Sequence, residues 1–217
     1  KGSNLRQKKL SIITAEMPDS VTIPGAVAGW DLLHKEYGYM PWKELFKPAI
    51  NFAKNGIEVH ERVAFDWPKN KEKLSKDLDT SNIFLKNGDA FKFMDNFKNE
   101  NLSKTFSAIA DEGYDGFYRG WVAKDMVNKL KSIEGCHTLE DFSNAKAEWV
   151  KPISSNYRNF MLHECPPNGQ GIVALLILSI LEKFDLKNMS KADYMHVFCE
   201  ATKIGYFLRD EYLADTE

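Results

Sequence analysis

The stretch Pro24-Gly25-Ala26-Val27-Ala28-Gly29-Trp30 decides how the first part of the chain folds. Thr22 and Pro24 have the chemistry of a helix start, because a hydroxyl can cap free N–H groups and proline lacks the N–H that a first turn leaves unbonded. The apolar residues of the stretch continue into Leu33 at the spacing of one helix face. Gly38 is a typical helix stop. The sequence therefore predicts a helix over residues 26–37.

Downstream of this helix, short helical patterns alternate with turns. Pro48 is predicted to start a new helix after a short helical turn, and Gly56 to end it. Pro68 is predicted to kink or break the next helix. Asn87-Gly88-Asp89 marks a turn within a mostly irregular excursion over residues 80–95. Helices are predicted over residues 42–46, 49–55, 60–77, 102–112, 121–133, 171–183 and 191–212, a capping-box turn over 138–142, and strands over 149–157 and 159–164.

The balance of these elements is mainly helix with little strand. The 217 residues are 43% hydrophobic, which is enough to bury a core. Because two strands need further strands to make a stable sheet, the chain is expected to be a portion of a single α+β domain, completed by segments outside residues 1–217. Residues 1–20 begin with a polar run and are expected to be mobile, with residues 10–14 as a candidate short strand.

Charge and cysteine content argue against several classes of protein. The 29 basic and 31 acidic residues give a net charge of -2, so no nucleic-acid-binding surface is predicted. The longest apolar run, residues 172–181, is too short to span a bilayer. Cys136, Cys165 and Cys199 are far apart and predict neither a disulfide framework nor a zinc site. We expect reduced, mostly buried thiols, which favours a cytoplasmic location over an exported one.

The sequence contains no recognisable motif for a nucleophile with its base, or for a metal site. There is no GxSxG or HExxH, and no two histidines have helical ligand spacing. Adjacent acidic pairs such as Asp111-Glu112 and Asp210-Glu211 point in different directions from a helix, so they predict solvated faces. No metal or organic cofactor is predicted. The histidines, which are expected at the surface or at interfaces, are His34, His60, His137, His163 and His196.

The segment Asn168-Gly169-Gln170-Gly171, just before an apolar helix, is a weak local candidate for substrate binding. Backbone N–H groups at a helix start lack intrahelical partners and can bind an anion or line a site. The simpler interpretation is a tight turn between a strand and a core helix. The segment has neither the lysine of a Walker loop nor the spacing of GxGxxG. Both interpretations stay open on the residues alone.

Several segments, taken in chain order, resemble the γ-glutamyltranspeptidase family. The opening stretch resembles the family's PGxxxG segment, and Phe117-Tyr118-Arg119-Gly120 resembles its FYxG corner. Residues 138–142 resemble its L-x-x-D turn, residues 166–171 stand where many relatives have PPPSSGG, and residues 209–215 resemble RxxYLxDP. No single motif decides the matter. Their collinear order over residues 24–215 covers nearly the whole chain and identifies it as a member of this family.

The resemblance implies a four-layer αββα sandwich of the N-terminal-nucleophile type, of which this chain is the helix-rich part. A precursor of this kind cuts itself into a large and a small subunit. The new N-terminal threonine of the small subunit attacks a γ-glutamyl amide, with its own α-amine as the base, and the acyl-enzyme passes to water or an amino acid. That threonine is expected beyond Glu217, and the arginine that binds the substrate carboxylate before Lys1.

No catalytic residue is therefore carried over onto this chain, and no cofactor is implied. Thr216 lacks the threonine-rich context of the family's cleavage site. The arginines of the chain are expected to have surface or structural roles: Arg6, Arg62, Arg119, Arg158 and Arg209.

The substrate is left open, because Asn168–Gly171 departs from the usual Pro-Ser-Ser-Gly-Gly. It resembles the γ-glutamyltransferase-like and cephalosporin-acylase branch. The leading hypothesis is an active γ-glutamyl hydrolase or transferase acting on glutathione or γ-glutamyl peptides, with a small subunit from the same precursor as its partner. The alternatives are an acylase of the same mechanism on another amide, such as glutaryl-cephalosporin or poly-γ-glutamate, and a non-catalytic relative. A homo-oligomer also stays open.

Overall fold

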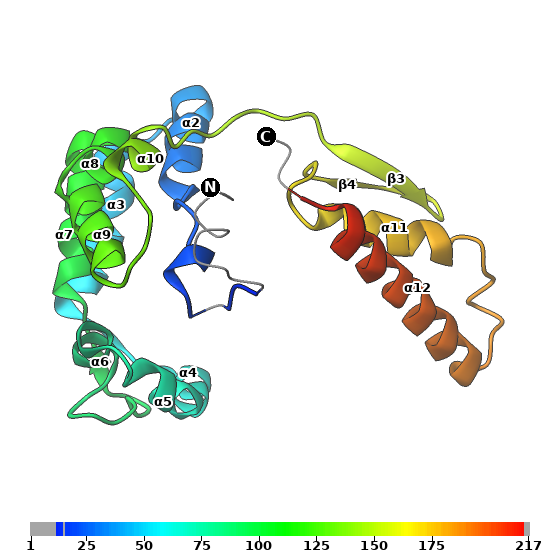
Figure 1. Cartoon of the computed structure of the whole chain (residues 1–217), viewed down its shortest axis with the longest axis horizontal. Coiled ribbons are helices and arrows are strands. Elements are labelled where there is room, and N and C mark those ends of the chain that lie inside the picture. The colour runs from blue at the N-terminus through cyan, green and yellow to red at the C-terminus, as the bar shows by residue number, and fades with distance from the viewer. Residues whose placement is uncertain (1–11, 15, 215–217) are drawn as a thin grey trace. The chain divides into compact units, whose positions relative to one another are not determined.

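The computed structural model describes residues 12–14 and 16–214, which form two compact units (Figure 1). Unit 1 is Lys1–Ala147 and unit 2 is Glu148–Glu217. The predicted mobility of residues 1–20 and the candidate strand over 10–14 fall largely outside the described residues, and residues 12–14 have no regular structure. That both units belong to one domain of a longer protein stays a prediction.

Unit 1 has a helical core in which α3 packs along α7, and α8 contacts α2, α7 and α9. The short helix η1 (Pro18–Ser20) precedes it. Tyr118, Phe142 and Ile109 are its most completely buried large side chains. The capping box predicted at residues 138–142 is present, with Thr138 and Asp141 as its two members. The helices are α2 (Ala26–Tyr37), α3 (Trp42–Asn55), α7 (Glu100–Glu112), α8 (Tyr114–Tyr118), α9 (Trp121–Ser132) and α10 (Leu139–Ser143).

The prediction of two helices around Pro48 is wrong, because α3 runs through this proline without a break. A proline inside a helix costs about 3 kcal/mol, since one hydrogen bond is lost and the ring crowds the preceding turn. The strongly amphipathic α3 offsets this cost by burying Phe46 and packing along α7. Gly56 ends the helix as predicted, with a φ of 91° that favours glycine.

A second part of unit 1 contains short elements. Pro68 interrupts the predicted 60–77 helix, which divides into α4 (Glu61–Asp66), η2 (Trp67–Asn70) and α5 (Lys71–Leu74). Helix α6 (Leu78–Phe84) replaces the first part of the predicted irregular excursion, because the Asp77 side chain caps its first turn. The turn at Asn87-Gly88 is confirmed by positive φ angles at both residues. Strands β1 (Ile57–Glu58) and β2 (Asn96–Phe97) form an antiparallel pair that was not predicted.

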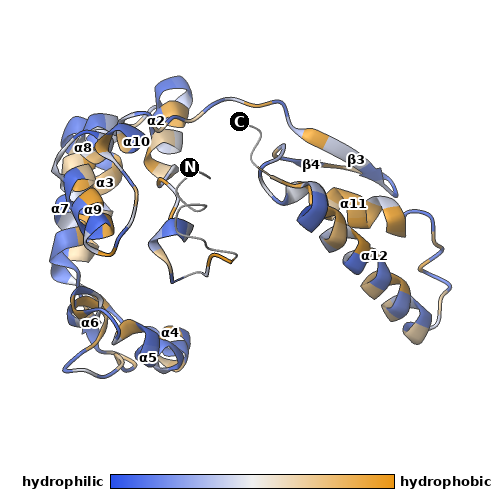
Figure 2. Cartoon of the chain, viewed as in Figure 1, coloured by the Kyte–Doolittle hydropathy of each residue, from blue (hydrophilic) through white to orange (hydrophobic). Residues whose placement is uncertain are grey.

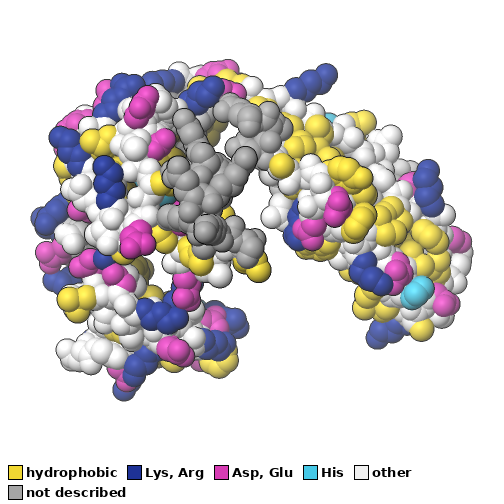
Figure 3. Space-filling model, viewed as in Figure 1, with side chains coloured by type: hydrophobic (Ala, Val, Ile, Leu, Met, Phe, Trp, Pro, Cys, Tyr) yellow, Lys and Arg dark blue, Asp and Glu magenta, His cyan; other side chains and the backbone are white. Residues whose placement is uncertain are grey.

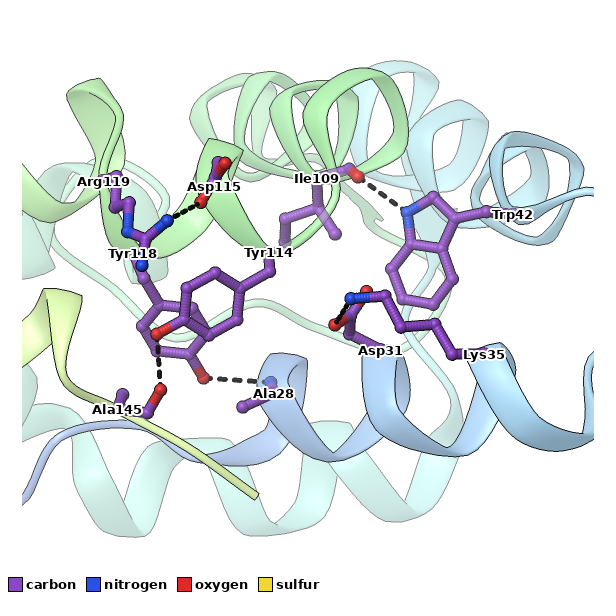
Figure 4. Close-up of polar contacts among 10 residues, drawn as sticks. All are labelled: Ala28, Asp31, Lys35, Trp42, Ile109, Tyr114, Asp115, Tyr118, Arg119 and Ala145. Atoms are coloured by element: carbon purple, nitrogen blue, oxygen red, sulfur yellow. Dashed lines mark hydrogen bonds and ion pairs between the residues drawn. The ribbon is translucent and has the colours of Figure 1, made fainter. Parts of the chain in front are cut away.

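The start of α2 is held by a tyrosine from α8 and not by the Thr22 hydroxyl that the sequence suggested. Gly25 is the N-cap residue and provides no side-chain cap. The Tyr118 hydroxyl instead lies between Pro24 and Ala28, donating to the carbonyl oxygen of Pro24 (2.6 Å) and accepting from the N–H of Ala28 (3.1 Å). The hydroxyl therefore stands in place of the first i→i−4 helix bond, from Ala28 to Pro24, and Figure 4 shows its contact with Ala28. Burial raises the pKa of this hydroxyl, which keeps it a neutral donor.

The neighbouring tyrosine of α8 makes a parallel connection. The Tyr114 hydroxyl donates to the carbonyl oxygens of Ala145 and Ser143, which lie just after and at the end of α10 (Figure 4). Gly116 lies between the two tyrosines, and a methyl group there would come within 2.2 Å of the Ala108 carbonyl oxygen on α7. Residues of α8 thus tie α2, α7 and the segment after α10 together, and of these residues Tyr118 belongs to the FYxG corner.

Unit 2 consists of an antiparallel hairpin and two helices. Strands β3 (Ile153–Tyr157) and β4 (Phe160–Glu164) pair around Arg158, which has a φ of 56° in the turn. Helix α11 (Gly171–Leu181) contacts both strands and α12 (Lys191–Tyr212). Figure 2 shows α11 as hydrophobic along most of its length, whereas α12 alternates between hydrophobic and polar. Gly205 allows the two helices to approach closely, because a methyl group there would lie 2.8 Å from Ile177 Cγ1.

Two expectations about burial are wrong. Cys136, Cys165 and Cys199 are exposed free thiols, which lie between α9 and α10, directly after β4, and on α12. His137 is only 8% exposed, and its Nε2 atom lies 2.7 Å from the Val21 carbonyl oxygen, so it anchors the segment that leads into α2. Among residues 12–14 and 16–214, no helix combines the length and the apolar composition that crossing a bilayer requires.

Candidate functional site

The segment Asn168–Gly171 lies in the loop between β4 and α11, so the predicted strand–turn–helix context is confirmed. Gln170 precedes the first residue of α11, and its carbonyl oxygen accepts from the N–H of Val173 at 3.0 Å. Asn168, Gly169 and Gln170 are exposed. The loop therefore presents exposed polar side chains next to the backbone N–H groups of a helix start.

Glycine is required at the first position of α11 because Glu164 lies against it. A methyl group on Gly171 would come within 2.6 Å of Glu164 Oε2 and 2.8 Å of Glu164 Cβ. A carboxylate near the positive end of a helix dipole is favourable. Since a negative charge already faces this helix start, the geometry suits the lining of a polar site better than the binding of a second anion.

Arg209 connects the candidate loop to α12, a contact that sequence reasoning missed. Its Nη1 atom donates to Gln170 Oε1 at 3.3 Å, and its Nη2 atom lies 2.7 Å from Asp210 Oδ1. The guanidinium carbon also lies 4.4 Å from the centre of the Tyr206 ring. These partners fix the guanidinium beside the loop, so the structural role expected for Arg209 has a definite geometry.

A cavity of about 380 Å³ adjoins the loop between the start of α11 and the end of α12. Its walls are mostly aliphatic and aromatic, and the guanidinium is the charged group among them. Such a lining can hold an apolar chain next to a fixed cation. The lining residues are Pro167, Ile172, Leu176, Leu208, Arg209, Tyr212, Leu213 and Ala214.

The arginines among the described residues, and Asp111, have structural partners. Each arginine in residues 16–214 forms an ion pair with a carboxylate of its own unit, whereas Arg6 lies outside the described residues. Asp111 pairs with Lys43 at 2.5 Å. Groups of three or more His, Cys, Asp or Glu side chains able to hold a metal are not found in the part of the chain that the structure describes. The pairs are Arg62–Asp66, Arg119–Asp115, Arg158–Glu182 and Arg209–Asp210.

The largest pKa changes belong to a surface ion-pair cluster of unit 1. Lys129 Nζ on α9 lies 2.6 Å from Asp77 Oδ2 and 2.7 Å from Asp79 Oδ2 at the start of α6. These hydrogen bonds raise the pKa of Lys129 to about 12. The hydrogen bond from Lys129, and then those from Thr80, lower the pKa of Asp77 to about 2. Both ionised forms are favoured, so the cluster joins two helices and has no group poised for proton transfer near neutral pH.

Comparison with known structures defines the class of fold. The chain is 29% identical to the cephalosporin acylase of Bacillus halodurans, with a TM-score of 0.87 over 99% of this chain and 41% of that one. The predicted fold class is confirmed: the chain is the helix-rich α+β part of an N-terminal-nucleophile hydrolase fold, and the two small sheets in the described residues are antiparallel.

Sequence comparison gives the family. The profile described as Gamma-glutamyltranspeptidase matches residues 4–217, so the chain belongs to the gamma-glutamyltranspeptidase family. It is 34% identical to the glutathione hydrolase-like YwrD proenzyme of Bacillus subtilis over 95% of this chain, and 35% identical to the glutathione hydrolase proenzyme of Escherichia coli over 89%. It spans only 40% and 34% of the lengths of these two relatives.

Proposed function

We propose that the complete protein is a self-processing amidohydrolase that cleaves γ-glutamyl amides, such as glutathione or γ-glutamyl peptides. The observation that carries the proposal is the family match over residues 4–217, together with one relative of 34% identity named as a glutathione hydrolase-like proenzyme and one of 35% identity named as a glutathione hydrolase proenzyme. A threonine exposed by cleavage, outside residues 1–217, is the nucleophile. Its α-amine takes the hydroxyl proton and gives it to the leaving amine as the amide C–N bond breaks, and the resulting acyl-enzyme passes its γ-glutamyl group to water or to an amino acid.

The residues of this chain position the elements around such a site, whereas the reacting groups lie elsewhere in the protein. The candidate loop and Arg209 hold the start of α11 in a fixed position, with polar side chains of Asn168 and Gln170 exposed. A second chain from the same precursor completes the site, in agreement with the proenzyme names of the relatives. No metal or organic cofactor is needed for this mechanism, because the nucleophile, base and acyl acceptor are all supplied by side chains, the chain start and the substrates.

A second candidate is an acylase of the same mechanism that takes a glutaryl amide. The TM-score of 0.87 to a cephalosporin acylase is the observation that favours it. A glutaryl group and a γ-glutamyl group differ by one ammonium substituent. A site built to bind that ammonium leaves buried polar groups unpaired when it is missing, and such sites discriminate strongly.

The test compares a γ-glutamyl amide with the glutaryl amide of the same amine, using purified full-length protein. We expect kcat/KM to favour the γ-glutamyl amide by about a hundredfold or more. Adding a dipeptide acceptor should yield a γ-glutamyl dipeptide if the transfer half-reaction operates. A preference for the glutaryl amide would support the acylase, and cleavage of neither amide by fully processed protein would contradict both enzymatic proposals.

A further inference from the structure

Unit 1 carries an apolar groove between α2 and α3 that is open among residues 12–14 and 16–147. The groove has a volume of about 580 Å³, and its walls are mainly the side chains of Trp30, Leu33 and Tyr37 on α2 and of Trp42, Leu45 and Phe46 on α3. Trp30 is 46% exposed and Leu33 is 52% exposed. Contiguous exposed apolar surface of this kind usually marks an interaction site.

The spacing of the lining residues indicates the shape of the occupant. On α2 they fall at positions 30, 33 and 37, and on α3 at positions 42, 45, 46 and 49, so each helix presents one face to the groove. The two walls meet through aromatic contacts at its base, with Trp30 and Phe46 ring centres 6.3 Å apart. Two helix faces that converge in this way fit a third helix, whose side-chain ridges pack between theirs.

The polar groups around the groove are already engaged. Trp42 Nε1 donates to the Ile109 carbonyl oxygen at 2.8 Å, and His34 Nε2 lies 2.7 Å from the Met40 carbonyl oxygen. On the outer turns of α2, Lys35 pairs with Asp31 at 2.6 Å (Figure 4). A charged ligand would therefore find little to bind, whereas the apolar face of an amphipathic helix would bury its side chains against the lining.

We infer that this groove is the docking site for an amphipathic helix from the part of the precursor outside residues 1–217. The lengths of the relatives show how much further chain a protein of this family can have. This chain spans 40% and 34% of the lengths of two relatives, so more than half of such a protein is available to cover the groove. A segment of the same polypeptide has a high effective concentration at the groove, which a second molecule lacks. The inference rests on the longer precursor of the proposed function but not on its activity.

Thiol labelling of the full-length protein tests this occupant directly. Cys136, Cys165 and Cys199 are first replaced by serine, because they are exposed in this structure. Single cysteines are then introduced as Leu33→Cys on α2 and Leu45→Cys on α3, and labelled with N-ethylmaleimide. Each native labelling rate is compared with the rate for the same variant in urea. The control is Leu78→Cys, because Leu78 is 75% exposed on α6 and does not line the groove.

We expect both groove cysteines to label at least about tenfold more slowly in the native protein than in urea, and the control to change by less than about threefold. Protection should persist on about a hundredfold dilution, since the occupant belongs to the same chain. Rapid labelling at either wall would overturn the inference, because a seated helix contacts both. Protection that disappears on dilution would also overturn it and would assign the groove to a second copy. Neither readout depends on catalysis, so failure here is distinct from failure of the proposed function.

Discussion

Units 1 and 2 bury their apolar residues to different extents. Unit 1 surrounds Tyr118, Phe142 and Ile109 almost completely, and its α8 corner holds helices on three sides. Unit 2 buries Val173, Leu175 and Leu181 of α11, whereas Ile172, Leu176 and Ile177 on the same helix are only half-buried. Figure 3 shows hydrophobic side chains gathered on the drawn face of α11 and α12. Unit 1 therefore has a hydrophobic core of its own, whereas unit 2 is a layer whose apolar side chains are only partly covered.

The largest effect on stability is expected from adding a methyl group at Gly116, where α8 lies close against α7 in the core of unit 1. Gly116→Ala puts a methyl group 2.2 Å from the Ala108 backbone carbonyl oxygen, so α7 and α8 must move apart. We expect a loss of about 3 kcal/mol in the free energy of unfolding, measured by urea denaturation. Gly29→Ala is the matched control, because that helical position has no atom within 4 Å and should be neutral or stabilising. Equal effects at both glycines would contradict the close packing of α8.

The second-largest effect on stability is expected from removing the Tyr118 hydroxyl, which lies at the start of α2. Tyr118→Phe leaves the N–H of Ala28 and the carbonyl oxygen of Pro24 without this partner in a buried place, so we expect a cost of about 2 kcal/mol. Urea denaturation measures it against Tyr194→Phe, a change on exposed α12 that should cost less than about 0.5 kcal/mol. A negligible cost for Tyr118→Phe would mean that α2 closes its first turn without help.

A smaller effect is expected for the helix contact of unit 2. Gly205→Ala places a methyl group 2.8 Å from Ile177 Cγ1, a side-chain atom and not a backbone atom, so we expect a loss of about 1 kcal/mol. Adding Ile177→Ala, which removes the Cγ1 atom, should make the cost of Gly205→Ala much smaller, and this coupling would show in a double-mutant cycle followed by denaturation. Strictly additive effects would indicate that α11 and α12 are already separated by other segments in the complete protein.

The smallest effect concerns the exposed cluster of Asp77 and Lys129. The pKa of Asp77 is about 2 in the folded state, below the ordinary value of 3.8. A depressed carboxylate pKa stabilises the fold above pH 3.8, and this contribution is lost as the pH falls toward 2. Lys129→Met should therefore flatten the decline of the denaturation midpoint between these pH values. Parallel acid profiles for the variant and the parent protein would show that the ion pair contributes nothing measurable.

Local signals predicted many element ends correctly. Gly38 ends α2, Gly56 ends α3, Thr138 and Asp141 form their capping box, and residues 191–212 are the bounds of α12. Each depends on backbone chemistry within a few residues, which a sequence displays directly. The continuous α3 was missed because its packing along α7 outweighs the local effect of Pro48.

Contacts between distant segments could not be predicted from the residues alone. The Tyr118 hydroxyl reaches Pro24, and the two-residue β1–β2 ladder joins segments separated by the whole of α4 to α6. The place of the candidate loop between β4 and α11 was predicted, but its contact with Arg209 depends on how α12 packs against α11. Its role in binding substrate stays a prediction, because the rest of the proposed site lies outside this chain.

The most direct test of the proposed function is the denaturing intact mass of protein expressed from the full-length gene, with N-terminal sequencing of every chain found. We predict two chains whose masses add up to that of the precursor plus one water molecule, with residues 12–214 in the larger chain and threonine as the first residue of the smaller one. A single uncleaved chain after prolonged incubation would contradict the self-processing amidohydrolase and favour a non-catalytic member of the family.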